Sequence, residues 1–194
     1  SAKDLEIALD IMAGPIEREA RGWQLNLPES RKSSLKDFNV AIWSNDELAP
    51  VSKDISQRCE DVGKNLASIG ANVSYTAKPE HDFLKAEINY QLLLQSVMQS
   101  GMSDDEFKKI EEIASNLDRN DLSADAILAK GTVLSHRNWI RQNYAREQIK
   151  ISWSKFFQEW DILICPQLAT TAIEHDHRKM SERTIMIDNQ EQRF

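Results

Sequence analysis

Glycine is scarce in this chain of 194 residues, and its six glycines are scattered (14, 22, 63, 70, 101 and 131). A phosphate-cradling loop needs several glycines close together, so dinucleotide and P-loop sites are excluded. Apolar runs fall far short of the roughly 20 residues that cross a bilayer. A charged segment followed by an apolar one, as in a secretory signal, is also missing. We therefore expect a cytoplasmic protein without a membrane partner.

Cysteine is equally rare, with only Cys59 and Cys165. They fall on an expected helix and an expected buried strand, which favours two reduced core thiols over a disulfide or a reactive thiol. The sequence contains neither CxxC nor HExxH. These absences argue against the common zinc and redox motifs.

An excess of positive charge is also missing, since the formal net charge is -7 and the pI about 5.2. Nucleic acids and anionic membranes are therefore poor candidates as partners. The apolar content of 41% and the charged content of 28% are ordinary for a globular protein. A chain of this length can bury a core and forms one domain or a little more.

Residues 1–80 predict an α/β portion. A helical apolar stripe near the start ends at Gly14-Pro15. The β-rich run "FNVAIW" (38–43) is followed by apolar residues at helical spacing up to Gly70, and then by the strand-like "NVSYT" (72–76). Strand, helix and strand in this order form a βαβ unit, which implies a parallel pair.

Residues 81–160 predict a helical subdomain inserted between strands. One helix closes near Gly101, the "SDDE" at 103–106 fits a capping box, and a long helix starts near Ser135. The apolar and aromatic side chains of the long helix are interpreted as core residues. They are Trp139, Ile140, Tyr144, Ile151, Phe156 and Trp160.

Residues 161–194 predict a returning strand, "DILICP", then a pocket loop and a hairpin turning near Asn189. The chain stops at Phe194, where the hairpin would leave an incomplete partner strand and an unpaired edge. The overall expectation is an α/β fold in which part of a mixed, largely parallel sheet is covered by helices. We also expect the chain to be a fragment of a longer protein.

Two clusters offer chemistry. His175 and His177 sit two residues apart, so their side chains can share one side of an extended segment. Zinc needs three or four convergent ligands, so local hydrogen bonds or a place at a pocket mouth are favoured over metal binding. "RKSSLKD" (31–37) offers serines beside lysines, but it is charged and free of glycine, so a solvated linker is the preferred interpretation.

Several segments in one order resemble the amidase signature family over nearly the whole chain, and general bacterial amidases most. "SAKDLEIALDIMAGP" is similar to the helix that follows the nucleophile segment in these enzymes. "FNVAIW", "LASIGANV" and "KGTVLSHRNW" follow in matching order, and "WDILICPQLATTAIEHDH" and "RTIMIDNQEQRF" resemble the family's later strand and hairpin.

The resemblance implies a hydrolase that cleaves carboxylic amides to acid and ammonia or amine through an acyl-serine. It implies a serine, a cis-linked serine and a lysine, with no metal and no cofactor. Those groups lie in a glycine- and serine-rich signature that nothing in this sequence matches, so no catalytic residue is assigned. The loop after the returning strand borders the substrate funnel in the family. The candidate substrate-binding residues are therefore Pro166, Gln167, Thr170, Thr171, His175 and His177.

The expected partner is thus a small-molecule amide in the full-length protein. An alternative of another class is a non-catalytic binding or interaction module derived from the amidase fold. A missing part of the sheet would expose an apolar face, so we also expect self-association or a homo-oligomer.

Overall fold

The computed structural model describes residues 1–178 and 182–193 and divides the chain into two compact units. The first unit spans residues 1–33 and contains helix α1 (Ala2–Met12). Ser1 and Asp4 form a capping box at its start. Beyond its end, Gly14 takes a φ of 135°, which a side chain would disfavour. The predicted helix and its stop at Gly14-Pro15 are confirmed.

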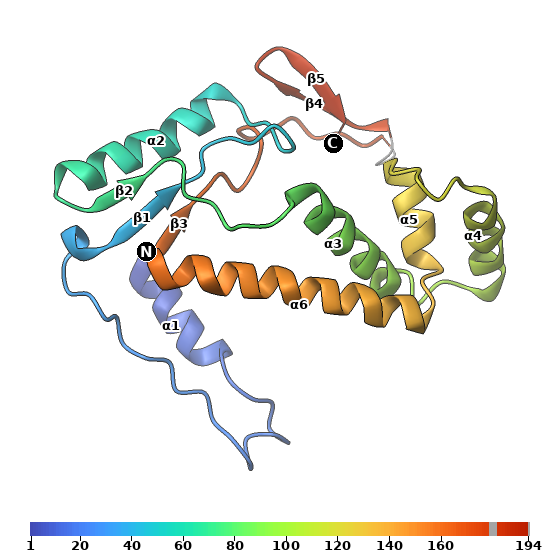
Figure 1. Cartoon of the computed structure of the whole chain (residues 1–194), viewed down its shortest axis with the longest axis horizontal. Helices are drawn as coiled ribbons and strands as arrows, with labels where there is room; N and C mark the ends of the chain where they lie inside the picture. The colour runs from blue at the N-terminus through green and yellow to red at the C-terminus, as the bar shows by residue number, and fades with distance from the viewer. Residues whose placement is uncertain (179–181, 194) are drawn as a thin grey trace. The chain divides into compact units, whose positions relative to one another are not determined.

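The second unit, from Ser34 onward, opens with a short 3-10 turn, η1 (Leu35–Asp37), and is built on a small parallel sheet. Strand β1 (Asn39–Ile42) lies between β2 (Asn72–Ser74) and β3 (Ile162–Ile164), both parallel to it (Figure 1). Helix α2 (Lys53–Ser68) connects β1 to β2 and contacts both strands. The predicted βαβ unit and the α/β class are confirmed.

Strand β1 forms the centre of the core. Val40, Ala41 and Ile42 are each at most 2% exposed, so both faces of this strand are covered. Strand β3 is only half-buried, less than its apolar sequence predicted. Cys59 is half-buried and Cys165, just beyond β3, is exposed, so the interpretation of both cysteines as core thiols is wrong for Cys165.

Four helices make up the segment between β2 and β3. They are α3 (Phe83–Met98), α4 (Asp104–Asn116), α5 (Ala124–Thr132) and α6 (His136–Glu159). The capping box of Ser103 and Glu106 and the start of α6 after Ser135 are confirmed. Helix α3 packs against both α5 and α6. The loop between α4 and α5 is held by the Lys130 ammonium, which donates to the carbonyls of Asp118, Arg119 and Asp121.

The long helix α6 is less buried than its aromatic content suggested. Phe156 is 7% exposed and joins a ring cluster with Trp153, Phe157 and Trp160. Tyr144, by contrast, is 69% exposed. The core interpretation is therefore confirmed for Phe156, whereas Trp139 and Trp160 are half-buried. It is wrong for Ile140, Tyr144 and Ile151, which are exposed.

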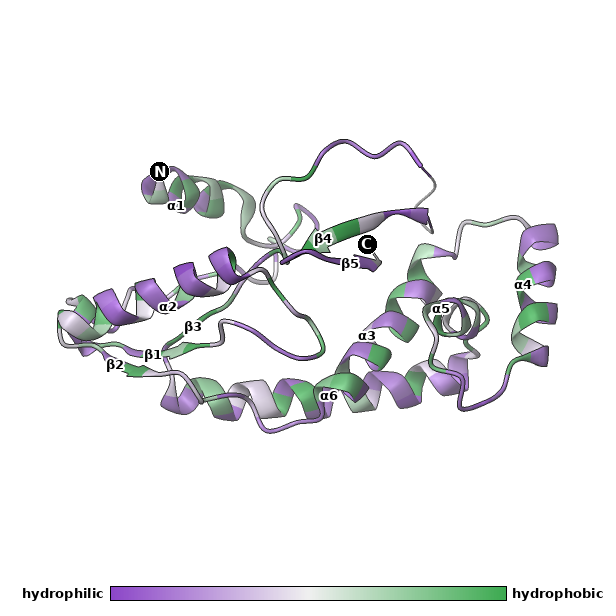
Figure 2. Ribbon diagram, turned by 90° about the horizontal axis from the view of Figure 1, so that it is seen from above, coloured by the Kyte–Doolittle hydropathy of each residue, from purple (hydrophilic) through white to green (hydrophobic). Residues whose placement is uncertain are grey.

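An antiparallel hairpin follows, separate from the parallel sheet. Strand β4 (Thr184–Ile187) pairs with β5 (Gln190–Arg193) from Thr184↔Arg193 to Ile187↔Gln190. Strand β4 is apolar in its middle and β5 is hydrophilic (Figure 2). Asp188 and Asn189 form the turn with φ of 46° and 67°, as a two-residue hairpin turn requires. Phe194, where we expected the hairpin to stop, lies outside the described residues.

Gly131 permits the closest approach between α5 and α3. A Cβ at this position would lie 2.7 Å from Gln95 Cβ and 3.1 Å from the carbonyl oxygen of Leu92. The second neighbour is backbone, which cannot rotate away. We predict that Gly131→Ala lowers the free energy of unfolding by about 1–3 kcal/mol, although alanine is the better helix former.

Chemical denaturation measures this change. The matched control is Gly101→Ala, because a Cβ there meets nothing within 4 Å. That variant should be as stable as the parent or slightly more so. Equal stability of the two variants would contradict the proposed tight contact between α3 and α5.

Candidate functional site

A crevice lies outside the carboxyl ends of β1 and β3. In open α/β sheets this is where ligands bind, because the loops leaving parallel strands meet there. The cavity has a volume of about 430 Å³. Three segments line it, namely the loop after β1, the loop after β3 and the hairpin. The lining residues are Trp43, Asn45, Asp46, residues 48–51 and 165–169, Ile185, Ile187 and Gln192.

The loop after β1 is held by the carboxylate of Asp46. It accepts hydrogen bonds from Trp43 Nε1 at 3.0 Å, from the Leu48 backbone N–H at 3.1 Å and from Lys78 Nζ at 2.9 Å. The Lys78 ammonium also lies 4.4 Å from the centre of the Trp43 ring. The Lys78 hydrogen bond and the Leu48 N–H lower the pKa of Asp46. Asp46 is therefore an ion-paired carboxylate that fixes the indole in the wall.

The loop after β3 is tied to the start of α2. The Ser52 N–H donates to the carbonyl of Ala169 at 2.7 Å, so residues 165–169 run along the N-terminus of this helix. At its beginning the loop follows the strand pairing, since the Trp43 N–H donates to Ile164 O at 2.9 Å. Backbone hydrogen bonds thus fix both ends of this wall.

The hairpin is tied to the same helix end. Asp188 accepts from the Lys53 N–H through both carboxylate oxygens, at 3.1 and 3.0 Å. Lys53 is the first residue of α2, and the side chain of Ser52 before it makes no capping bond. The turn of the hairpin therefore supplies the cap, which also matches the positive end of the helix dipole. Ile185, Ile187 and Gln192 then face the cavity from the hairpin.

We predict that Asp188→Gly lowers the free energy of unfolding by about 1 kcal/mol, because the α2 N-terminus loses its carboxylate cap. Glycine accepts the left-handed φ at this position, so backbone strain does not contribute. The matched control is Asn189→Gly, which changes the neighbouring left-handed residue of the same turn. Urea denaturation compares the two variants, and equal loss in both would show that the turn, not the cap, was disturbed.

Two of the residues proposed from the sequence line the crevice, Pro166 and Gln167. Thr170, half-buried, and Thr171, exposed, follow directly and are not among the described lining residues. His175 and His177 are exposed, with ring centres 6.3 Å apart. Their substrate contacts stay a prediction.

The residues between and after the two histidines make a local ion pair. Asp176 binds Arg178 at 2.7 Å, and hydrogen bonds from Arg178 lower the pKa of this carboxyl. Within residues 1–178 and 182–193, no three His, Cys, Asp or Glu side chains converge as a metal ion requires. The Asp176 carboxylate is thus engaged by arginine.

Sequence reasoning missed the other two walls of the crevice. Trp43 is the last residue of "FNVAIW", and its place after a predicted parallel strand was a usable signal. Ile185, Ile187 and Gln192 carried no such signal, because a hairpin sequence does not reveal which loop it lies against. Asp188 was equally hidden, since its partner Lys53 is distant in sequence.

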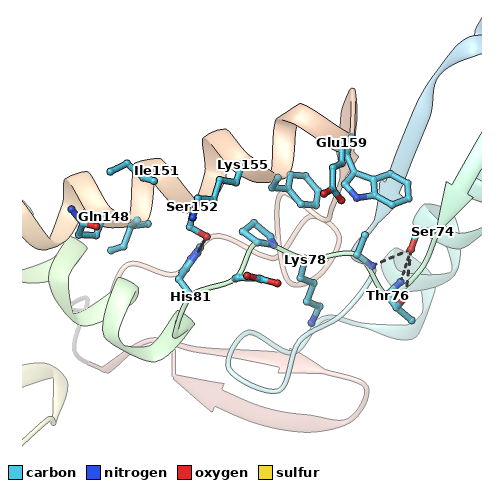
Figure 3. Close-up of a pocket in the computed structure, with 15 residues that line it drawn as sticks. Ser74, Thr76, Lys78, His81, Gln148, Ile151, Ser152, Lys155 and Glu159 are labelled. Carbon is cyan, nitrogen blue, oxygen red and sulfur yellow. Dashed lines mark hydrogen bonds between the residues drawn. The ribbon is translucent and has the colours of Figure 1, made fainter.

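A second cavity, of about 810 Å³, lies between the segment after β2 and α6 (Figure 3). The His81 and Ser152 side chains, both in its lining, point toward one another, with Nδ1 and Oγ 3.2 Å apart. The rings of Phe83 and Trp153 lie 4.4 and 5.9 Å from the His81 ring. This burial lowers the pKa of His81, so the ring is neutral near pH 7.

The lowered pKa of His81 predicts a pH dependence of stability. The unfolded chain takes up the proton near the ordinary value of 6.5, before the native state does. Stability is therefore retained above this pH and falls as the pH drops through it toward 5. Urea denaturation between pH 7.5 and 5 should show this slope, and His81→Gln should reduce it. An unchanged slope in His81→Gln would assign the pH dependence to other groups.

None of the helices described within residues 1–178 and 182–193 combines the length and apolar character that spanning a membrane requires. Comparison with curated proteins finds no match. A family model described as Amidase matches residues 1–192, nearly the entire sequence, and this range includes the parallel sheet, the helical segment and the crevice loops. The chain belongs to the amidase family.

Proposed function

We propose that this chain supplies the scaffold and one wall of the substrate site of an amidase. The full enzyme would hydrolyse a carboxylic amide to an acid and ammonia or an amine through an acyl-serine. The observation that carries this proposal is the crevice at the carboxyl ends of β1 and β3. Its wall includes Pro166 and Gln167, which the family resemblance independently assigns to the substrate funnel.

Two described serines close to the cavities, Ser52 and Ser152, do not offer an equivalent nucleophile. Ser52 follows the lining residue Val51, but its Oγ is buried and has no hydrogen-bond partner among the described residues. A substrate carbonyl cannot reach such an atom. Ser152 has a histidine partner, yet it lies inside α6, where backbone N–H groups are engaged in the helix. An oxyanion hole needs free N–H groups aimed at the developing charge.

The run of serines and lysines at 31–37 is also unsuitable. Ser33 ends the first compact unit and Ser34 begins the second. Ser34 precedes the 3-10 turn without a side-chain capping bond. No glycine-rich backbone accompanies this segment, which agrees with its interpretation as a linker. We therefore infer that the catalytic serine and lysine come from polypeptide outside these 194 residues.

The edge of β3 suggests where such polypeptide would attach. Within the described residues β3 pairs only with β1, so its other edge can accept a further strand. A parallel strand added there would end at the crevice and place its following turn beside Pro166. The same open edge, together with exposed apolar side chains such as Leu5 and Ile11 of α1, favours self-association of the isolated chain.

We predict that the purified chain releases no ammonia from hexanamide or benzamide. Among the described lining residues of the crevice there is no serine, and the thiol of Cys165 has no lysine or histidine base beside it in the wall. The protein encoded together with the upstream part of its gene should hydrolyse amides, and that upstream part should be rich in glycine and serine. Ammonia release, measured with both proteins, tests this proposal.

The control is Ser152→Ala in the isolated chain. If the isolated chain hydrolyses amides with saturable kinetics and this activity is lost in Ser152→Ala, the proposal that the catalytic serine lies outside this chain is wrong. An inactive longer protein, or a start codon directly before Ser1, would instead favour the alternative of a non-catalytic binding module derived from this fold.

A further inference from the structure

We infer that the crevice selects amides with an uncharged, apolar acyl group, and that the hairpin forms the wall that recognises it. This inference rests on the proposed function, because it names the substrate class for that same site. It depends on the chemistry of the three walls, on the alternation of side chains in β4 and on the hydrogen bonds that hold the hairpin in place.

The walls of the crevice are mainly apolar. Leu48, Pro50 and Val51 come from the loop after β1, and Pro166 and Leu168 come from the loop after β3. A volume of about 430 Å³ lies in the usual range for sites that bind small molecules. Burial of hydrocarbon in such a site is favourable in proportion to the area removed from water.

The polar groups of the crevice carry no free charge. Asn45, Gln167 and Gln192 are neutral amides. Asp46, which is charged, lines the crevice and is paired with Lys78 at 2.9 Å; the other lining residues that the structure describes are uncharged. A carboxylate on the acyl group would be repelled by this aspartate. The described lining residues include no unpaired cation that could bind it. The side-chain amides of the wall offer hydrogen-bond donors and acceptors to an uncharged ligand. A charged ligand would lose its hydration in the crevice without gaining an ion-pair partner.

Strand β4 directs its side chains to two sides. Ile185 and Ile187 face the crevice, and Ile187 is only 5% exposed. Met186, between them, is 55% exposed and points away. Gln192 pairs with Ile185 across the hairpin and also faces the crevice. Asp188 fixes this face against the α2 N-terminus, so the two isoleucines form a positioned wall.

The binding of small amides to the isolated chain tests the inference without any catalysis. Acetamide, butanamide and hexanamide form a series of increasing apolar length, and 6-amino-6-oxohexanoic acid adds a carboxylate at the far end. Backbone amide shifts of Cys165, of residues 167–169 and of residues 185–192 report binding in NMR titrations. We expect affinity to rise about fourfold for each added methylene group. The carboxylated amide should bind more weakly than butanamide.

The matched pair of variants is Ile185→Asn and Met186→Asn, which place the same polar side chain on opposite sides of β4. Ile185→Asn should weaken hexanamide binding about tenfold, as expected for loss of one apolar side chain from the wall, and Met186→Asn should leave it unchanged. Leu168→Asn provides a second lining variant at a side chain that is 71% exposed, so its folding is secure. It should weaken hexanamide binding as well.

Equal affinity across the series, equal binding of the carboxylated amide, or full hexanamide binding in both lining variants would overturn the inference. These outcomes differ from failure of the proposed function. An inactive longer protein with length-dependent binding to this chain would refute the amidase role and leave the apolar selectivity standing. If the longer protein is active but amide affinity for this chain does not depend on the length of the acyl group, the amidase role is supported and the apolar selectivity is refuted.

Discussion

The crevice depends on the parallel pairing of β3 with β1, and that pairing is locked at its amino end. Asn39 and Asp161 exchange hydrogen bonds: the Asn39 N–H donates to Asp161 Oδ2 at 2.8 Å, and the Asp161 N–H donates to Asn39 O at 2.9 Å. Asn39 Nδ2 also donates to Glu159 O, at the end of α6. The register fixed here brings Ile42 and Ile164 level at the carboxyl end. The loop after β1 and the loop after β3 therefore leave the sheet side by side, at the same height along the strands.

The N-terminus of α2 is the second fixed point. Ser52 and Lys53 offer backbone N–H groups that the helix itself cannot satisfy, and each is taken by a different wall of the crevice. Ala169 accepts one and Asp188 accepts the other. The backbone N–H groups at the start of α2 thus fix the position of the loop after β3 and of the hairpin turn, both distant from α2 in sequence. Because Asp188 caps the helix in place of Ser52, the buried Ser52 hydroxyl has no hydrogen-bond partner among the residues that the structure describes, which is unfavourable.

Sequence patterns predicted local structure well and tertiary contacts poorly. The βαβ unit, the capping box at Ser103 and the start of α6 followed from apolar spacing and cap residues, which act within one turn. Helix α5 was not singled out, because its Ala-rich sequence carries a weak stripe. Exposure was misjudged at Tyr144 and Cys165, since periodicity does not say which neighbour covers a face. Of the crevice, only the wall at Pro166 and Gln167 was predicted, through the family resemblance.

The proposed separation of the substrate-binding wall from the catalytic groups has a physical basis. A wall of apolar side chains needs only correct position, and two backbone anchors at the α2 N-terminus provide it. A nucleophile also needs an exposed hydroxyl, a base and free N–H donors in one rigid turn. At the α2 N-terminus the N–H groups of Ser52 and Lys53 already bind Ala169 and Asp188. The hydrogen bonds that fix the two walls therefore leave these two donors unavailable to an oxyanion hole. This arrangement supports the proposal that the chain contributes to substrate recognition and that the catalytic groups belong to another segment of the enzyme.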